Sequence, residues 1–296
     1  MAEGRPGTVA ALRDWLAARL TGAVDDPLSE ARELLAALHD APRSWAAMHA
    51  EDGPGDLLID AADAAVTLRA AGAPMPYATN RAAFRHLFLH VDERVLIPRP
   101  ETEELVTLAL PFIAPGSTVV DVGTGSGAIA LALAQESEAG RVIGSDICPD
   151  AIDVAEMNAR SLLRRDHART EFLLGSLLEP LGDEQVDVVV SNPPYIALGE
   201  AEALPAAVRD WEPALALFGG EDGMAVIRAL VAQCTARLTA SGVLLMEIDA
   251  RRSAEALACV TGPDWRDVQL LPDQFGRDRF VLARRTAATP AVAQGS

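Results

Sequence analysis

The spacing of apolar residues changes near residue 83, and this change divides the chain into two differently built parts. In the first part, apolar residues recur every three or four positions, which is the spacing of one helix face. Two such runs are Val9, Leu12, Leu16 and Leu20, and Leu28, Leu34, Leu35 and Leu38. A third helical stretch, residues 57–72, follows a break at residues 51–56 and ends at Gly72. We therefore predict a small helical bundle over residues 8–74.

After residue 83 the apolar runs are short and typical of strands. Two of them, residues 83–91 and 94–98, flank Asp92 and Glu93. Acidic residues between two strand-like runs indicate a turn. We therefore predict a β-hairpin that turns at Asp92 and Glu93.

From Thr118 onward, short apolar strands alternate with helical stretches. The expected strands are residues 118–123, 141–146, 170–175, 186–192 and 242–248. The expected helices between them are residues 128–136, 151–163 and 224–238. Such alternation is typical of an α/β fold whose mostly parallel sheet is covered on both faces. Two last runs, residues 265–273 and 278–285, are separated by only four residues, which predicts an antiparallel hairpin that closes the sheet.

Composition limits the classes of protein to be considered. Half of the 296 residues are apolar, so the chain can bury a sizeable core. There are 43 acidic and 25 basic residues, which gives a net charge of −18. Broad binding to nucleic acid needs a cationic surface, so we expect no direct nucleic-acid binding, whereas a basic protein partner remains open.

Cysteines, histidines and hydropathy give expectations about metal, compartment and membrane. The three cysteines, Cys148, Cys234 and Cys259, form no Cys-x-x-Cys pair, and an odd number fits a reducing cytosol. The five histidines are scattered, and we expect no metal site. No secretory signal pattern and no apolar run of about 20 residues are evident. We predict a cytoplasmic protein, away from membranes, that is a monomer.

A glycine-rich stretch lies between the first long strand and the helix after it. Gly123, Gly125 and Gly127 alternate with Thr124 and Ser126. Glycines there let the backbone turn tightly and approach a ligand, and the helix that follows presents free N–H groups. The spacing differs from the dinucleotide fingerprint because the third glycine comes one residue early. Taken alone, the stretch is equally a tight strand-to-helix turn.

Two aspartates near this loop favour an adenosyl ligand. Asp146 ends the next strand, about twenty residues after the glycines, where a carboxylate can accept hydrogen bonds from a ribose diol. Asp121 comes just before the loop, near where a positively charged ligand group could lie. The alternative is that both are ordinary strand-end aspartates.

The strand at residues 186–191 ends in Asn192-Pro193-Pro194-Tyr195. Two consecutive prolines fix φ and make a rigid loop. The Asn192 side-chain oxygen and a backbone carbonyl such as that of Pro193 could accept the two N–H groups of a planar nitrogen. Tyr195 offers a face against which a planar group could pack. The alternative is a stiff turn with an aromatic residue at its rim.

These motifs resemble those of a known class of enzymes. Residues 121–127 together with Asp146 are similar to the cofactor motif of S-adenosylmethionine-dependent methyltransferases with a seven-stranded, Rossmann-like sheet, and the closing hairpin is a mark of that class. Asn-Pro-Pro-Tyr is similar to the motif of methyltransferases that act on a planar exocyclic or amide nitrogen, which include DNA adenine and protein glutamine enzymes.

Further stretches narrow the resemblance. Residues 94–106 (RVLIPRPETEELV), 208–224 (VRDWEPALALFGGEDGM) and 74–84 (PMPYATNRAAF), with the helical N-terminal part, resemble the release-factor glutamine methyltransferases of the PrmC/HemK family. The resemblance implies methylation of the side-chain amide nitrogen, N(5), of the glutamine in the Gly-Gly-Gln loop of peptide-chain release factors. A ribosomal protein or another substrate, a DNA adenine, or a non-catalytic cofactor-binding role remain the alternatives.

The resemblance also implies a domain plan. It consists of a helical substrate-recognition domain (1–80), a β-hairpin linker (81–98) and an S-adenosylmethionine-dependent methyltransferase domain (99–285). Residues 286–296 are mostly small and include a proline, which predicts a disordered tail.

It further implies roles for individual residues. Expected cofactor-binding residues are Asp121, Gly123, Thr124, Gly125, Ser126, Gly127, Asp146, Ile147, Ser176, Leu177 and Asn192. Expected substrate-binding residues are Asn192, Pro193, Pro194, Tyr195, Arg99 and Glu101. Of these, Asn192, Pro193 and Tyr195 are expected to be catalytic, and no metal is expected. Arg99 and Glu101, with Thr102, are expected to organise the wall of the site. The alternative for Arg99 is an ordinary ion-paired surface residue.

Three positions depart from the family pattern. Ser176 stands where many members have an acidic residue near the adenine, and Ser176 or the Leu177 backbone could contact the base instead. Asp249 replaces the glycine of the usual Glu-x-Gly after the fifth strand, and Asn80 replaces a glycine of the connector.

Overall fold

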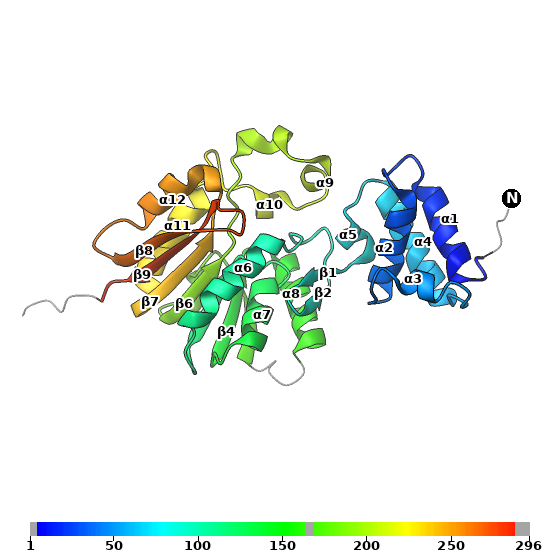
Figure 1. The fold of residues 1–296 in the computed structure, drawn as a ribbon. Coiled ribbons are helices and arrows are strands. Elements are labelled where there is room, and N and C mark those ends of the chain that lie inside the picture. The colour runs from blue at the N-terminus through cyan, green and yellow to red at the C-terminus, as the bar shows by residue number, and fades with distance from the viewer. Residues whose placement is uncertain (1–4, 164–168, 288–296) are drawn as a thin grey trace, which may run out of the picture. The chain divides into compact units, whose positions relative to one another are not determined.

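The computed structural model describes residues 5–163 and 169–287, and these form two compact units (Figure 1). The first unit contains residues 5–82, 91–93 and 205–211, and the second contains residues 83–90, 94–204 and 212 onward. The predicted linker, residues 81–98, is divided between the two units. Of the tail predicted to be disordered, residues 288–296 lie outside the described residues.

The first unit is helical. Its helices are α1 (Val9–Leu20), α2 (Pro27–Leu38), α3 (Trp45–Met48), α4 (Asp56–Ala70), α5 (Met75–Thr79) and α9 (Ala206–Arg209). The Thr8 side chain caps α1 by accepting a hydrogen bond from the Ala11 N–H, and Asp26 caps α2 through the Ser29 N–H. Most of the apolar positions seen in the sequence form the core, in which Leu12, Leu16, Leu20, Leu34 and Leu35 are fully buried, whereas Leu28 is exposed.

A short hairpin opens the second unit, and its turn is not where the sequence predicts it. The strands are β1 (Ala82–Phe84) and β2 (Leu87–Leu89), so the chain turns at Arg85 and His86 rather than at Asp92 and Glu93. Arg85 has a φ of 53° and is held by side chains distant in sequence. Its backbone N–H donates to the Glu103 carboxylate, and its guanidinium pairs with Glu136. These tertiary contacts fix the turn.

The second unit is built on a seven-stranded sheet in the order β5-β4-β3-β6-β7-β9-β8. Its strands are β3 (Thr118–Val122), β4 (Arg141–Asp146), β5 (Thr170–Leu174), β6 (Val186–Ser191), β7 (Leu238–Glu247), β8 (Trp265–Pro272) and β9 (Asp278–Arg285). All neighbours are parallel except β9, which is antiparallel to both β7 and β8. The predicted α/β fold with an antiparallel closing hairpin is confirmed.

Helices cover both faces of this sheet (Figure 1). They are α6 (Pro100–Ala109), α7 (Ala128–Glu136), α8 (Pro149–Leu162), α11 (Ala225–Arg237) and α12 (Ser253–Cys259), while the short helix α10 (Ala214–Leu217) belongs to the segment between β6 and α11. Short 3-10 turns are η1 (Leu110–Phe112), η3 (Glu179–Leu181), η4 (Leu198–Ala203) and η5 (Ala250–Arg252). Side chains alternate along β3: Val120 and Val122 pack in the core beneath α11, whereas Asp121 accepts a hydrogen bond from Ala130 of α7. The two helix layers therefore lie on opposite faces.

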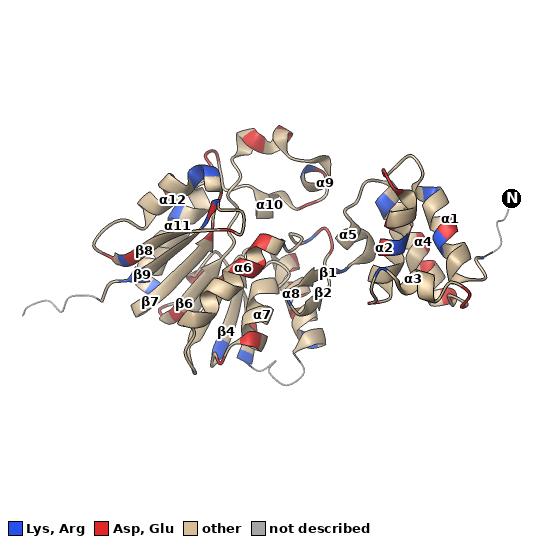
Figure 2. Ribbon diagram, in the orientation of Figure 1, with Lys and Arg blue, Asp and Glu red and all other residues tan. Residues whose placement is uncertain are grey.

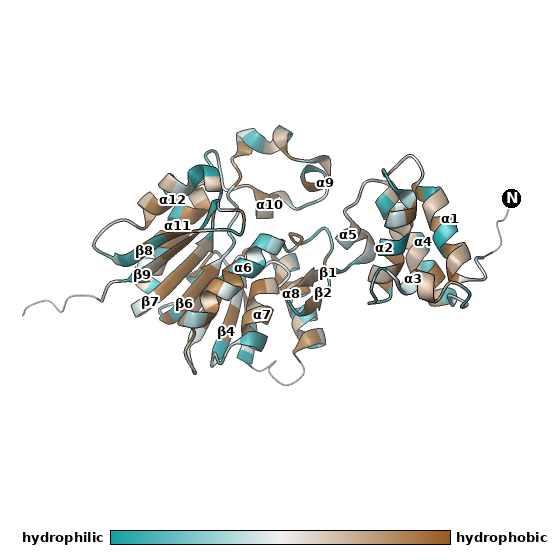
Figure 3. Cartoon of the chain, viewed as in Figure 1, coloured by the Kyte–Doolittle hydropathy of each residue, from teal (hydrophilic) through white to brown (hydrophobic). Residues whose placement is uncertain are grey.

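The hydropathy of the strands matches this sandwich. The central strands of the sheet are strongly hydrophobic along their length (Figure 3), as expected for parallel strands buried on both sides. The strand order runs outward from β3 in both directions, with β4 on one side and β6 on the other. The loops that follow β3 and β6 therefore leave the same edge of the sheet at a topological switch point, where open α/β sheets bind ligands.

Candidate active site

The glycine loop after β3 uses its three glycines in two ways. All three have positive φ, 72° at Gly123, 54° at Gly125 and 81° at Gly127. A Cβ on Gly123 or Gly125 would meet open space, whereas one on Gly127 would lie 3.2 Å from Leu131 and 3.3 Å from Ala155. The first two glycines therefore leave the loop open to a ligand, and Gly127 lets α7 pack closely on α8.

Thr124 and Ser126 hold the loop from inside. Both are buried. The Thr124 hydroxyl donates to Asp121 Oδ2 over 2.7 Å, and the Ser126 carbonyl accepts a hydrogen bond from Asn158 Nδ2 over 2.8 Å. Neither residue lines the cavity described next, so their observed contacts fix the shape of the loop.

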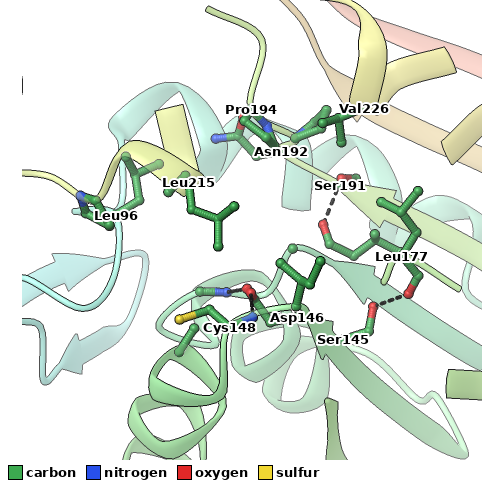
Figure 4. A pocket seen from close by; sticks show the side chains of 18 of the residues that line it. Leu96, Ser145, Asp146, Cys148, Leu177, Ser191, Asn192, Pro194, Leu215 and Val226 are labelled. Carbon is green, nitrogen blue, oxygen red and sulfur yellow. Dashed lines mark hydrogen bonds between the residues drawn. The ribbon is translucent and has the colours of Figure 1, made fainter. Parts of the chain in front are cut away.

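A cavity of about 380 Å³ lies at the switch point, entirely within the second unit. Nine of the residues expected to form the site line it: Gly123, Gly125, Asp146, Ile147, Ser176, Leu177, Asn192, Pro193 and Pro194. Figure 4 shows Asp146 and Cys148 on one side, Asn192 and Pro194 on the other, and Leu215 between them. The site therefore joins a polar end at β4 to the proline loop after β6.

Asp146 is fixed at the cavity wall by backbone groups. Its Oδ2 accepts the Gly125 N–H and its Oδ1 accepts the Cys148 N–H, each over 2.9 Å (Figure 4). Burial raises the pKa of Asp146 above its usual value, and these backbone hydrogen bonds oppose the rise. Because a carboxylate has about four acceptor positions, Asp146 keeps acceptor capacity for a ligand hydroxyl.

Asp121 lies beneath the glycine loop and does not line the cavity. Its Oδ2 accepts hydrogen bonds from Thr124 and Ala130, but its buried Oδ1 has no partner within the described part of the chain. Burial raises the pKa of Asp121 to about 7, and the nearby Asp146 carboxylate adds to the rise. A cation bound close to this loop would lower that pKa and stabilise the carboxylate.

The proline loop is clamped by residues 217–220 of the WEPALALFGG stretch. The Ile196 N–H donates to the Leu217 carbonyl over 3.0 Å, and the Gly219 N–H donates back to the Ile196 carbonyl over 2.9 Å. A Cβ on Gly219 would lie only 2.4 Å from the Pro194 carbonyl oxygen. The two motifs therefore form one rigid unit in which glycine is required for close approach.

A chain of hydrogen bonds holds the Asn192 side chain from behind. Asn192 Nδ2 donates to Thr102 Oγ1 over 3.0 Å, and the Thr102 hydroxyl donates to Glu247 Oε2 over 2.8 Å. The Tyr195 hydroxyl donates to Glu247 Oε1 over 3.3 Å. Thr102 lies on α6 and Glu247 ends β7, so three distant segments meet behind the loop.

Tyr195 and Glu101 do not line the cavity. The Tyr195 ring packs against the core beneath α11, and burial, with the charge of Glu247, raises the pKa of Tyr195 above its ordinary value. Glu101 belongs to the charged surroundings of Glu247, where it raises the pKa of that carboxyl. In this structure both belong to the wall behind the proline loop.

Arg99 joins two of the motifs without lining the cavity. It pairs with Glu212, which is buried and also accepts a hydrogen bond from the Ile97 N–H over 3.4 Å. Glu212 thus holds the IPRPE segment against WEPALAL. Cavity residues that the sequence did not single out include Arg94, Val95, Leu96, Cys148, Leu215, Phe218 and Val226. Five of these seven belong to the stretches 94–106 and 208–224, which are recognisable in the sequence as motifs but indicate no role for these residues.

Two of the three departures from the family pattern, Asn80 and Asp249, have local explanations. Asn80 has a φ of 54°, and asparagine is among the few residues other than glycine that adopt this conformation readily. Asp249 has a φ of −71°, which needs no glycine, and its side chain accepts the Arg251 N–H at the start of η5. Ser176 and Leu177 both line the cavity.

Comparison with known proteins places the chain in a family. Residues 11–79 match the family model of the PrmC N-terminal domain, and residues 104–208 match that of the methyltransferase small domain. A release factor glutamine methyltransferase of Cereibacter sphaeroides is 37% identical over 94% of this chain and 98% of its own length. That of Moorella thermoacetica is 43% identical over 75% of this chain and 78% of its own.

The chain belongs to the release factor glutamine methyltransferase family. Membership of this family makes it a methyltransferase that uses S-adenosylmethionine. A solved methyltransferase structure from Pyrococcus furiosus has the same fold, with a TM-score of 0.52 and 15% identity over 69% of this chain and 91% of that one. Among the described residues, no group of three or more His, Cys, Asp or Glu could hold a metal ion. Nor is any described helix both long and apolar enough to span a membrane.

The residues present fit S-adenosylmethionine. The two open glycines and the fixed Asp146 carboxylate offer a cradle and an acceptor for an adenosyl ligand. The apolar side chains of Ile147 and Leu177 can flank a planar base, and the orphaned Asp121 oxygen provides negative charge beneath the loop. The arrangement can hold a nucleoside at one end and places Asn192 at the other.

Proposed function

We propose that this protein methylates the side-chain amide nitrogen of the glutamine in the Gly-Gly-Gln loop of peptide-chain release factors. The observation that carries the proposal is the position of Asn192, which lines the cofactor cavity in a rigid proline loop while its Nδ2 is engaged elsewhere. The names of the relatives support the choice of a release factor as the substrate.

In the proposed reaction, the main task of the protein is to position the substrate amide nitrogen. An amide nitrogen is a weak nucleophile because its lone pair is delocalised into the carbonyl group. Asn192 Oδ1 and the Pro193 carbonyl are acceptors that can bind its two protons, hold it in place and favour tetrahedral character. S-adenosylmethionine, when bound, supplies an electrophilic methyl group. The proline loop fixes both acceptors, and this pre-organisation lowers the entropic part of the barrier.

Each residue expected at the cofactor then has a specific task. Gly123 and Gly125 allow the loop to approach the ligand, and Asp146 accepts hydrogen bonds from the ribose. Ile147, Ser176 and Leu177 surround the base. Asp121, Thr124, Ser126 and Gly127 support the loop from below.

We also propose that the enzyme is monomeric, cytoplasmic and does not bind nucleic acid directly. Figure 2 shows basic residues interspersed with acidic ones along the ribbon of each unit. The three cysteines are all free, which fits a reducing compartment. Light scattering gives the mass in solution. Fractionation of cells should place the protein with cytoplasmic markers.

The substrate can be tested without assuming it. Lysate from cells that lack this protein is incubated with the purified enzyme and methyl-labelled S-adenosylmethionine, and the labelled species are separated. A labelled band that mass spectrometry identifies as a release factor supports the proposal. Label in a ribosomal protein or in a small molecule, with release factors unlabelled, contradicts it. The Asn192→Ala variant is the control for transfer at this site.

A further inference from the structure

The hydrogen-bond chain behind Asn192 is buried and directional. Thr102 is 4% exposed and Glu247 is 1% exposed, so water does not compete for these bonds. A threonine hydroxyl has a single proton, and here the proton points to Glu247 Oε2 over 2.8 Å. The Thr102 hydroxyl oxygen therefore offers only its lone pairs to the Asn192 side chain. The side-chain end that meets Thr102 over 3.0 Å must therefore be the NH₂ group.

This polarity determines which end of the amide is available to the substrate. An asparagine amide has an accepting oxygen and a donating nitrogen that differ little in shape. With Nδ2 turned to Thr102, Oδ1 is left as the acceptor. A flipped amide would present N–H groups to the N–H groups of the glutamine and could not accept from them.

We propose that Thr102 and Glu247 are positioning residues that set the orientation of the Asn192 amide. This inference rests on the function proposed above and adds residues that act through Asn192 without touching the substrate. Glu247 is the anchor because its carboxylate can only accept, and it accepts from both Thr102 and Tyr195. Tyr195 thereby helps to hold the anchor.

The surroundings of Glu247 are consistent with an anionic anchor. Arg279 of β9 faces it with a positive charge, and Glu101 of α6 faces it with a negative one. Burial raises the pKa of Glu247, while Thr102, Arg279 and Tyr195 act in the opposite direction. These three groups offset part of the cost of burying the carboxylate.

Two substitutions at Thr102 distinguish the effect of losing its hydroxyl group, which orients Asn192, from the effect of losing side-chain packing. Thr102→Val keeps the shape and removes the hydroxyl, whereas Thr102→Ser keeps the hydroxyl and removes a methyl group. We expect Thr102→Val to lower kcat by about tenfold or more, with the cofactor Kd and the melting temperature close to those of the wild type. Thr102→Ser should keep kcat within about threefold of the wild type, because its hydroxyl can make the same two bonds.

A double-mutant cycle tests the chain as a unit. Glu247→Gln alone should lower kcat, because a glutamine amide can donate to Thr102 and release the threonine proton towards Asn192. Combined with Thr102→Val, the loss should be much smaller than the product of the two single losses. Multiplicative losses, or a Thr102→Ser enzyme as impaired as Thr102→Val, contradict the proposal.

A readout that does not use turnover distinguishes this proposal from the proposed function. In ¹⁵N-labelled protein, the Asn192 side-chain signal is assigned as the one lost in Asn192→Ala. We expect one of its two protons to exchange slowly with water in the wild type and in Thr102→Ser, and quickly in Thr102→Val. Rapid exchange in all three proteins overturns the positioning role, whatever substrate is methylated. Slow exchange with no transfer to a release factor overturns the proposed function alone.

Discussion

At the scale of single residues, the proposed mechanism depends most on Asn192. It is the one predicted catalytic side chain that both lines the cavity and has its orientation fixed by a buried partner. Pro193 contributes a backbone carbonyl, and Tyr195 lies behind the loop with its hydroxyl on Glu247. The proposed mechanism therefore relies on two hydrogen-bond acceptors that the proline loop holds in place.

Replacing Asn192 with alanine should abolish most of the turnover. The substitution removes one of the two acceptors for the amide protons, and losing one such preorganised group costs about a hundredfold or more in kcat. Because the glycine loop and Asp146 are untouched, the cofactor Kd should change much less than kcat. Steady-state kinetics and calorimetry check the two expectations. A variant with near-normal kcat would contradict the role of Asn192.

Asp121 should make cofactor binding depend on pH. Burial raises its pKa to about 7, so the carboxyl is mostly protonated below that pH when the cavity is empty. A cationic ligand favours the carboxylate, so affinity should rise as pH increases towards 7, and binding at pH 6 should release a proton.

Calorimetry at pH 6 in two buffers with different ionisation enthalpies measures that proton. The Asp121→Asn variant is the matched control, because any proton release from Asp146 remains in it. Equal proton release by the wild type and the variant would contradict this role of Asp121.

Some residue roles could be predicted from sequence and others could not. Gly123, Gly125 and Asp146 are near one another in the chain and lie at the ends of predictable strands. Their position at the cavity could therefore be predicted. Thr102 and Glu247 are 145 positions apart, and their hydrogen bond exists only after folding. Tyr195 was predicted beside the substrate, but a motif does not say which face of a loop points inward.

At the scale of elements, the proline loop depends on the stretch that clamps it. Residues 217–220 pair with residues 196–198 through backbone hydrogen bonds, and Gly219 and Gly223 lie against the loop carbonyls. Alternating strands and helices were predictable because each strand is a short apolar run between helical stretches. The clamp could not be predicted, because it is irregular backbone without a periodic sequence pattern.

Gly219→Ala tests the clamp. The new Cβ would lie 2.4 Å from the Pro194 carbonyl oxygen, so the proline loop or the clamp must move. We expect kcat to fall by about tenfold or more, since small displacements of reacting groups cost that much. Gly199→Ala, in the same region, is the control because its Cβ would meet nothing within 4 Å. Equal activity of the two variants would show that the clamp does not position the loop.

The hairpin turn between β1 and β2 also lies at a different position from the one that the sequence predicts. Asp92 and Glu93 have the composition of a turn, and Arg85 and His86 do not. The turn forms at Arg85 because Glu103 and Glu136 bind it, and these residues come from α6 and α7. Local turn propensity was overridden by tertiary hydrogen bonds.

At the scale of the whole molecule, the net charge of the protein favours a protein substrate over a nucleic-acid substrate. A net charge of −18 opposes the phosphate backbone of nucleic acids, so duplex DNA should not retain the enzyme at physiological salt. Retention is measured on a DNA column, with a basic protein of similar size as the positive control. Tight retention that weakens with rising salt would contradict this prediction and would favour a nucleic-acid substrate.

The most direct test of the proposed function uses purified components. Release factor from cells that lack this enzyme is incubated with the enzyme and S-adenosylmethionine, and mass spectrometry locates any added methyl group. We predict one methyl group on the side-chain nitrogen of the Gly-Gly-Gln glutamine, and none when that glutamine is replaced or when the enzyme carries Asn192→Ala. A wild-type enzyme that binds the cofactor yet leaves this glutamine unmodified would contradict the proposed function.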